Sequence, residues 1–392
     1  MRKLISITLL LFAGVSVFAQ AGFDGFLQEI IRNNTQLKAY QSATEAQKLE
    51  NRTGLNPADP SVEGGYLWGS PAGIGNRKDF SVTQEIEFPT VYVHQQKLAT
   101  IRERQADLEY LQHRREILQQ AADLWVEWGY LNQRTEVLVN RQHDARELAR
   151  AYDEMLATGE ANRIDRNKAA LYLLQTEQEL QQLELDKQQM VMLLASLNGG
   201  KPLAVDESDY LPVQLPGDRE AWLEQVMDVN PQLQWLQQEL QAGKQSEKLN
   251  RAKSLPRLNG GYMMESVGAE KFQGITVGLS VPLWERKNTV KAARAQQEAA
   301  LLQENDFRLQ WRSHLLQIFH RAENAQRLVD SYRGQLAQIQ QKELLDEALH
   351  AGQISLIDYL QELQFNYEAV DQLMEAEKQL QATYADLLIL IR

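Results

Sequence analysis

A very long helix is the feature of this sequence that most restricts its fold. No proline occurs between Val91 and Ala157, and apolar residues recur every seven positions along this stretch. The residues at this spacing are Tyr110, Ile117, Leu124, Leu131, Leu138, Ala145 and Tyr152. At about 1.5 Å per residue, such a helix is on the order of 100 Å long, which is more than a compact domain can hold. The stretch therefore predicts a helix that lies in a coiled coil.

The chain also repeats itself at a separation of about half its length. Three pairs of segments match in the same order along the chain: 34–37 with 230–233, 64–66 with 260–262, and 156–165 with 349–358. Matches over so much of the chain indicate an internal duplication. We expect two structural repeats, residues 20–197 and 219–392, joined by a linker at 198–218 that is rich in Gly, Pro and acidic residues.

Each repeat has the same predicted order of elements, namely an opening helix, a β-hairpin, a long helix, a tight turn and a return helix. In the first repeat we expect the hairpin at 58–88, the long helix at 91–157 and the return helix at 161–197. In the second repeat we expect the hairpin at 256–283, the long helix at 289–349 and the return helix at 355–391. The predicted fold class is mainly α with a small β part.

The predicted hairpin strands alternate between apolar and polar residues, as a strand with two different faces does. In the segment 80–88, one face carries Phe80, Val82, Ile86 and Phe88, and the other carries Ser81, Thr83, Glu85 and Glu87. This pattern fits either a half-buried soluble hairpin or the strands of a transmembrane barrel. Strand lengths of about ten residues favour the barrel, and so do nearby aromatic residues, which are Tyr66, Trp68, Tyr92, Tyr262 and Trp284. The smallest barrels have about eight strands, so a chain with four must oligomerise.

The N-terminal residues 1–19 have the pattern of a secretory signal peptide. Arg2 and Lys3 precede an apolar stretch, which ends in small residues at Ala19. We therefore expect an exported protein. No later apolar run approaches the roughly 18 residues that a transmembrane helix needs.

Composition and motifs argue against several function classes. A net charge of −12 disfavours a nucleic-acid-binding surface, and the absence of cysteine excludes disulfides, a thiolate nucleophile and an acylated N-terminal cysteine. No phosphate-binding loop is present, and the six histidines are scattered along the predicted helices without the spacing of a metal site. We predict no enzyme activity, no cofactor and no bound metal.

Together these features resemble the TolC family of outer-membrane efflux ducts, over essentially the whole mature chain. The motifs that carry the resemblance are 230–233 in the opening helix, Ser280-Val281-Pro282-Leu283 at the last strand, and a Gly-to-Asp spacing of six residues at both helix tips. The resemblance implies a homotrimer whose transmembrane barrel of 12 strands continues as a helical tunnel into the periplasm. It also implies a location in the outer membrane of a Gram-negative bacterium, in contact with outer-membrane lipid.

The resemblance further implies the channel component of a tripartite efflux system, with a periplasmic adaptor protein and an inner-membrane efflux pump as partners. The segment 83–92 is similar to the branch that works with heavy-metal pumps of the resistance-nodulation-division class, which implies metal cation efflux. The alternative is a periplasmic adaptor or structural coiled-coil protein, because such a protein shares the export signal and the heptads. An adaptor, however, has one helical hairpin flanked by soluble β domains.

The two helix tips are the candidate functional sites. Gly159 and Gly352 provide the backbone freedom that a reversal of direction after a long helix requires. These tips lie farthest into the periplasm in the implied orientation. We therefore expect Gly159, Glu160, Gly352 and Gln353 to form the adaptor contact.

The resemblance also assigns a periplasmic gate. It places Asp358 at the closed constriction and Asp165 in a lock that keeps the gate shut, although an Asp at a helix start is also stabilised by up to about 1 kcal/mol without any gate. Gln361 occupies the position of a second acid in the family, and Ile354 that of a basic lock residue. The lock must therefore be built differently, and Arg163 and Arg166 are the candidates.

Overall fold

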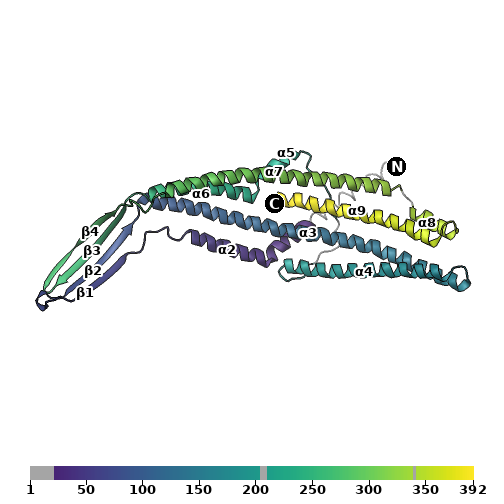
Figure 1. Cartoon of the computed structure of the whole chain (residues 1–392), viewed down its shortest axis with the longest axis horizontal. Coiled ribbons are helices and arrows are strands. Elements are labelled where there is room, and N and C mark those ends of the chain that lie inside the picture. The colour runs from purple at the N-terminus through teal and green to yellow at the C-terminus, as the bar shows by residue number, and fades with distance from the viewer. Residues whose placement is uncertain (1–21, 204–209, 339–340) are drawn as a thin grey trace, which may run out of the picture. The chain divides into compact units, whose positions relative to one another are not determined.

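The computed structural model describes residues 22–203, 210–338 and 341–392 (Figure 1). The predicted signal peptide at 1–19 lies outside these residues. The described chain is mainly helical with one small antiparallel sheet, so the predicted fold class is confirmed. None of the described helices combines the length and the hydropathy that a membrane-spanning helix requires.

The chain forms two compact units, and its longest helices run through both of them. The helical unit comprises the described residues of 1–38, 113–226 and 312–392, and the sheet unit comprises 39–112 and 227–311. Each unit therefore contains parts of both sequence repeats.

The sheet unit contains one sheet of four antiparallel strands in the order β1-β2-β3-β4 (Figure 1). The strands are β1 (Ser61–Leu67), β2 (Arg77–Ile86), β3 (Arg257–Val267) and β4 (Glu270–Ser280), and the short helix η1 (Ala72–Ile74) lies between the first two. β1 and β2 come from the first repeat and β3 and β4 from the second. The pairing of β2 with β3, for example Val82 opposite Tyr262, therefore joins the two repeats in one sheet.

The register of the strands separates two chemically different faces. The apolar face carries Val62, Phe80, Val82, Ile86, Leu258, Tyr262, Met264, Ile275, Val277 and Leu279. The mainly polar face carries Ser61, Glu63, Asp79, Ser81, Thr83, Glu85, Asn259, Glu265 and Thr276, together with the apolar Leu67, Met263, Val267 and Phe272. The alternation predicted for the strands is therefore confirmed. Of the aromatic residues noted near the predicted strands, Tyr262 lies in the middle of the sheet, between Val82 and Ile275.

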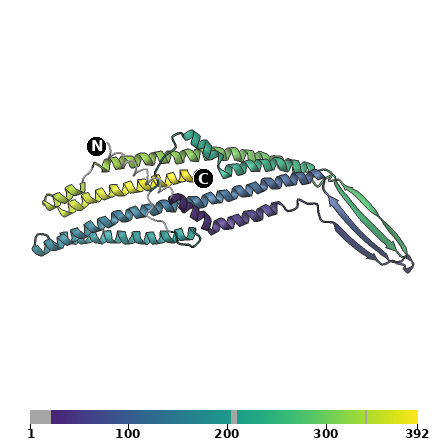
Figure 2. The ribbon, with the colours of Figure 1, turned by 180° about the vertical axis from the view of Figure 1, so that it is seen from behind.

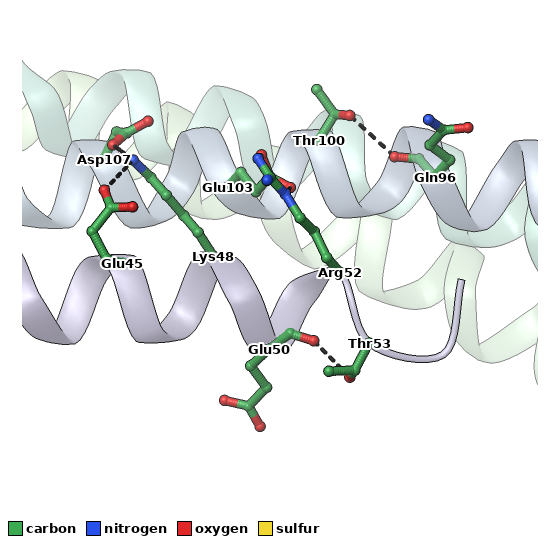
Figure 3. A network of polar contacts seen from close by, with 9 residues as sticks. All are labelled: Glu45, Lys48, Glu50, Arg52, Thr53, Gln96, Thr100, Glu103 and Asp107. Carbon is green, nitrogen blue, oxygen red and sulfur yellow. Dashed lines mark hydrogen bonds and ion pairs between the residues drawn. The ribbon is translucent and has the colours of Figure 1, made fainter. Parts of the chain in front are cut away.

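Helix α2 (Thr35–Asn51) packs along the start of α3 (Pro89–Thr158) through ion pairs in the sheet unit (Figure 3). The Lys48 ammonium lies 2.5 Å from Asp107 Oδ1 and 3.1 Å from Glu45 Oε1, and these bonds raise the pKa of Lys48. One turn further along, the Arg52 guanidinium binds both carboxylate oxygens of Glu103 at 2.7 and 2.9 Å. Charged pairs, rather than apolar contacts, thus align this part of α2 with α3.

The repeated motif at 34–37 and 230–233 marks two helix starts. Asn34 Oδ1 accepts a hydrogen bond of 2.8 Å from the Leu37 amide at the start of α2. Asn230 Oδ1 accepts an equal bond from the Leu233 amide at the start of α6 (Pro231–Ala252). The proline of the second motif occupies the first helical position, where a missing N–H costs nothing.

The helical unit contains a helix over residues 22–33, the second part of α3, and α4 (Arg163–Leu197), α5 (Arg219–Asp228), α8 (Gln341–His350) and α9 (Leu356–Leu390). Its main apolar cluster joins the helix over 22–33 to α3 and α9. Phe23, Leu27 and Ile30 are fully buried there, and the Phe23 and Trp125 rings meet edge to face at 5.6 Å. Five of the seven α3 heptad positions predicted to face the coiled coil are buried, and the other two, Tyr110 and Leu124, are half-buried.

The second long helix differs from the prediction of one helix over 289–349. α7 (Thr289–Leu336) ends in a turn at 337–338, and α8 begins at Gln341. The heptad stripe of α7 explains this end. Leu315, Ala322 and Val329 are completely buried at this spacing and Leu336 follows, but the next heptad position holds the charged Glu343. A continuous helix would direct this charge toward the core, whereas the break allows Leu345 and Leu349 of α8 to reach the apolar cluster at the tips.

Candidate functional site at the helix tips

The two predicted tip turns have the same backbone geometry. Gly159 and Gly352 have φ angles of +83° and +67°, which lie in the left-handed region. The next amides donate back into the preceding helix, from Glu160 to Met155 O at 2.8 Å and from Gln353 to Ala348 O at 2.9 Å. This is the Schellman ending of a helix, and it leaves the side chains of Glu160 and Gln353 exposed.

The two acids at the starts of the return helices take part in their caps. Asn162 Oδ1 accepts from the Asp165 amide at 2.9 Å, and Asn162 Nδ2 donates to Asp165 Oδ2 at 2.7 Å. In the second repeat, Ser355 and Asp358 form a capping box, in which Ser355 Oγ donates to Asp358 Oδ2 at 2.6 Å. Both acids therefore have a helix-capping role within one chain.

The basic residues proposed for the lock have other positions. Arg166 pairs with Asp153 across the first hairpin, with Nε 2.6 Å from Oδ1, and Asp165 pairs with Lys168 at 3.1 Å. Arg163 is exposed. Among the described residues, no ion pair joins Asp165 or Asp358 to the other hairpin.

Asp358 and Gln361, both predicted for the gate, lie one turn apart on an exposed part of α9. On the opposite side of this turn, Leu356, Tyr359 and Leu363 are buried against Tyr152 and Ala169 of the first hairpin. Ile354, which occupies the basic position of the resembled family, packs against the same apolar cluster. The α3–α4 and α8–α9 hairpins thus lie side by side, as both views show (Figures 1 and 2).

A layer of polar side chains behind the tips was missed in the sequence. We call it the polar layer, and it consists of Arg141 and Asp144 on α3, Tyr172 on α4, Lys342 and Asp346 on α8, and Tyr359, Tyr367 and Asp371 on α9. The sequence signal is Arg141, because it lies three residues after Leu138 and four before Ala145, on the buried heptad face. A charge at such a position requires partners.

Arg141 is the centre of the polar layer. It is 6% exposed, and its guanidinium binds both carboxylate oxygens of Asp371, at 2.6 and 3.1 Å. The same group donates to the Tyr367 carbonyl at 3.3 Å and lies 4.2 Å from the centre of the Tyr367 ring. These contacts pair the buried cation through its two terminal nitrogens, while its buried Nε has no hydrogen-bond partner, and they connect α3 to α9.

Two further contacts connect α8 to its neighbours. Lys342 Nζ lies 2.5 Å from Asp144 Oδ2; burial lowers the pKa of Lys342, but this ion pair raises it overall. The Tyr359 hydroxyl donates to Asp346 Oδ1 at 2.7 Å, and burial together with this bond raises the pKa of Tyr359. Tyr172 also has a raised pKa, chiefly because of burial. These hydroxyls therefore stay protonated at neutral pH.

A groove of about 540 Å³ opens beside the polar layer in the helical unit. α4 and α9 form its walls, and Arg141, Tyr172, Tyr367 and Asp371 are among the residues that line it. Charges of both signs face it, including Lys168. No group of three or more His, Cys, Asp or Glu side chains in the described parts of the chain is arranged to hold a metal ion.

No protein-family model and no curated protein sequence matches this chain. Solved structures do match it. A membrane protein from Pseudomonas aeruginosa superposes with a TM-score of 0.74 at 14% identity, over 95% of this chain and 94% of that chain. The outer membrane protein VceC from Vibrio cholerae gives 0.71 at 14% identity, over 95% of both chains. The transmembrane channel CusC gives 0.72 at 12% identity, over 95% of this chain and 92% of that chain.

These similarities show that the chain has the fold of outer-membrane channels over nearly its whole length. The resemblance predicted from the sequence is confirmed at the level of the fold.

Proposed function

We propose that this protein is the channel component of a tripartite efflux system in the outer membrane of a Gram-negative bacterium. The apolar face of the sheet is the observation that carries this proposal. Ile275 and Val277 on this face are 84% and 83% exposed, whereas the opposite face of β4 carries polar residues and glycine apart from Phe272. A continuous apolar face of this kind is costly in water and favourable against lipid.

The dimensions of the strands support a membrane position. β2, β3 and β4 have 10, 11 and 11 residues, close to the roughly 9–11 residues of a transmembrane strand. In the described sheet β1 and β4 each have one paired edge, so their other edges are available to neighbouring copies. Three copies would then supply the 12 strands of one barrel, as the resemblance implies.

A stripe of exposed apolar residues on α4 supports a homotrimer independently of the sheet. Ile164, Leu171, Leu185 and Met192 lie at heptad spacing, and each is between 47% and 67% exposed. Apolar residues at heptad spacing normally pack against another helix. We propose that a helix of the neighbouring copy covers this stripe in the tunnel.

The tips support the remaining parts of the proposal. Glu160 and Gln353 project from two equivalent turns, and we propose that they meet a periplasmic adaptor that links the channel to an inner-membrane pump. Asp358 would then form a gate of three carboxylates around the axis. The chain would act as a passive duct without catalysis, and heavy-metal cations remain the predicted cargo.

Membrane fractionation and cross-linking test the channel proposal. We expect the full-length protein in the outer-membrane fraction, as a heat-modifiable species that cross-links to three copies in detergent. Release with the soluble periplasm, or a stable monomer with intact strands, would contradict it.

Planar-bilayer recordings test the gate separately. Close carboxylates attract cations, so Asp358→Ala should reduce cation selectivity and block by multivalent cations. Ser355→Ala is the matched control, because it removes the hydroxyl of the same capping box and keeps the carboxylate. Equal behaviour of both variants would leave Asp358 as a capping residue only.

A further inference from the structure

Two lysines end the apolar face of the sheet at the side of the hairpin turns. Lys78 on β2 lies opposite Ser266 on β3, and Ser266 lies opposite Lys271 on β4. Tyr66 on β1 completes this row, because it lies opposite Lys78. We call these four residues the lysine row. Since adjacent strands lie about 4.8 Å apart, the Cα atoms of the two lysines are roughly 10 Å apart.

The rest of the apolar face carries no charged side chain in the paired residues between the lysine row and its far end. The four rows that follow end in the row of Ile86, Leu258 and Leu279. From Lys271 to Leu279 the strand is about 27 Å long, at about 3.4 Å per residue. Because barrel strands are tilted by roughly 35–45°, this length covers about 20 Å of height, which is most of the lipid-facing band of about 25 Å. If this face contacts lipid, as the proposed function requires, the lysine row lies at the level of the headgroups.

The two lysines have no acidic partner in the described chain, whereas nearby basic residues do. Arg77 precedes Lys78 but points to the polar face, where its Nε lies 3.2 Å from Glu265 Oε1. The Lys78 ammonium instead lies 5.7 Å from the centre of the Tyr66 ring. Both lysines are exposed on long flexible stems. Their charges are therefore available to an anion on the lipid side.

Aromatic residues near the same row indicate an interfacial position. The rings of Tyr66 and Trp68 meet edge to face at 5.4 Å, and Trp68 is 81% exposed. Tyrosine and tryptophan with one apolar and one polar end are typical of the boundary between hydrocarbon and headgroups. The lysine row thus combines two cations without an acidic partner, aromatic rings near them, and apolar rows that continue along the strands.

We infer that Lys78 and Lys271 bind the phosphate of an anionic lipid headgroup, with the Ser266 hydroxyl between them and the acyl chains on the apolar face. This inference rests on the proposed membrane location. The ligand is a membrane lipid rather than soluble phosphate, because only a lipid also uses the apolar rows that continue from the lysines.

Lipid retention by the full-length protein tests the inference. The protein is purified in mixed micelles that contain phosphatidic acid and phosphatidylcholine, and native mass spectrometry counts the bound molecules of each. Near a membrane surface each basic residue contributes roughly a fivefold preference for anionic lipid, so Lys78→Gln with Lys271→Gln should lower the phosphatidic acid preference by about 30-fold. Arg77→Gln is the matched control, because it removes a charge from the opposite face one residue away.

Three results would overturn the inference. They are unchanged retention in the double variant, an equal loss in Arg77→Gln, and displacement of the lipid by inorganic phosphate, which would indicate a site for the soluble ion. Planar-bilayer conductance of the same wild-type preparation separates this outcome from the proposed function. A wild-type protein that conducts but shows no lipid preference contradicts the lipid site alone, and one that neither inserts nor conducts contradicts the channel as well.

Discussion

The ion pair between Arg141 and Asp371 should respond differently to the loss of each partner. Arg141 is buried, with 8% of its side chain exposed, whereas 45% of the Asp371 side chain is exposed. Asp371→Ala therefore leaves a buried cation without its carboxylate, and Arg141→Met leaves a carboxylate that water can reach. Methionine also suits the apolar heptad position that Arg141 occupies.

The expected magnitudes follow from this asymmetry. Removing the partner of a fully buried charge costs about 3–5 kcal/mol, and the half-exposed position of Asp371 reduces this, so we expect about 2–3 kcal/mol for Asp371→Ala. Arg141→Met should cost less than about 1 kcal/mol. The double variant should resemble Arg141→Met, because no unpaired cation then remains.

Hydrogen exchange of the full-length protein in detergent measures these effects locally. A loss of about 2–3 kcal/mol speeds exchange of the amides around Leu138 and Tyr367 by roughly 30- to 150-fold if the helices open there. Arg146→Met is the matched control on the same helix, because Arg146 and Glu177 form an exposed pair at 3.6 Å that contributes little. The reasoning is refuted if Asp371→Ala exchanges no faster than Arg146→Met, or if the double variant is no better protected than Asp371→Ala.

Three further predictions concern other parts of the chain. Leu171→Glu on the exposed α4 stripe should reduce the yield of cross-linked trimer, while the helical content measured by circular dichroism stays unchanged. An unchanged yield would show that this stripe does not contact a neighbouring copy. Burial raises the pKa of Asp386 to about 6, so the folded state favours the protonated form, and the stability that this form contributes is lost as pH rises from about 4 to above 6. Asp386→Asn should therefore flatten the dependence of Tm on pH in this range, and an unchanged slope would contradict the raised pKa of Asp386. Gly352→Ala should destabilise the second tip by about 1 kcal/mol because Gly352 has a positive φ, whereas Gly334→Ala inside α7 should stabilise the helix by about 0.5–1 kcal/mol. Thermal melting in which both variants shift Tm in the same direction would be inconsistent with these backbone conformations.

Sequence periodicity was sufficient for the faces of the sheet strands and for the position of the tip turns. The strand faces could be predicted because alternation in a strand has a period of two, and the register then placed Val82, Tyr262 and Ile275 in one apolar row. The tip turns could be predicted because a left-handed position after a long helix favours glycine, as at Gly159 and Gly352. These features depend on local sequence alone.

Apart from the signal at Arg141, the members of the polar layer could not be predicted, because the layer depends on which helices meet. Lys342 and Asp144 are far apart in the sequence, and neither is unusual on an exposed helix. The end of α7 was missed for a related reason, since a charge at one heptad position, Glu343, is tolerated in many helices. The effect of these residues on the structure depends on how the two hairpins pack, which the sequence does not give.

The two repeats of the duplication have diverged at the tip that carries the proposed gate. In the first repeat, α3 continues without a break to its tip at Thr158, so the first hairpin is one piece with the long helix. In the second repeat, α8 is separated from α7, and polar contacts from Lys342 and Tyr359 tie this hairpin to its neighbours. Ion pairs and hydrogen bonds depend on geometry more strongly than apolar packing does, so a small displacement of this hairpin would break several contacts together. If the channel opens at its tips, we propose that the second hairpin is the one that moves and that it carries Asp358 away from the axis.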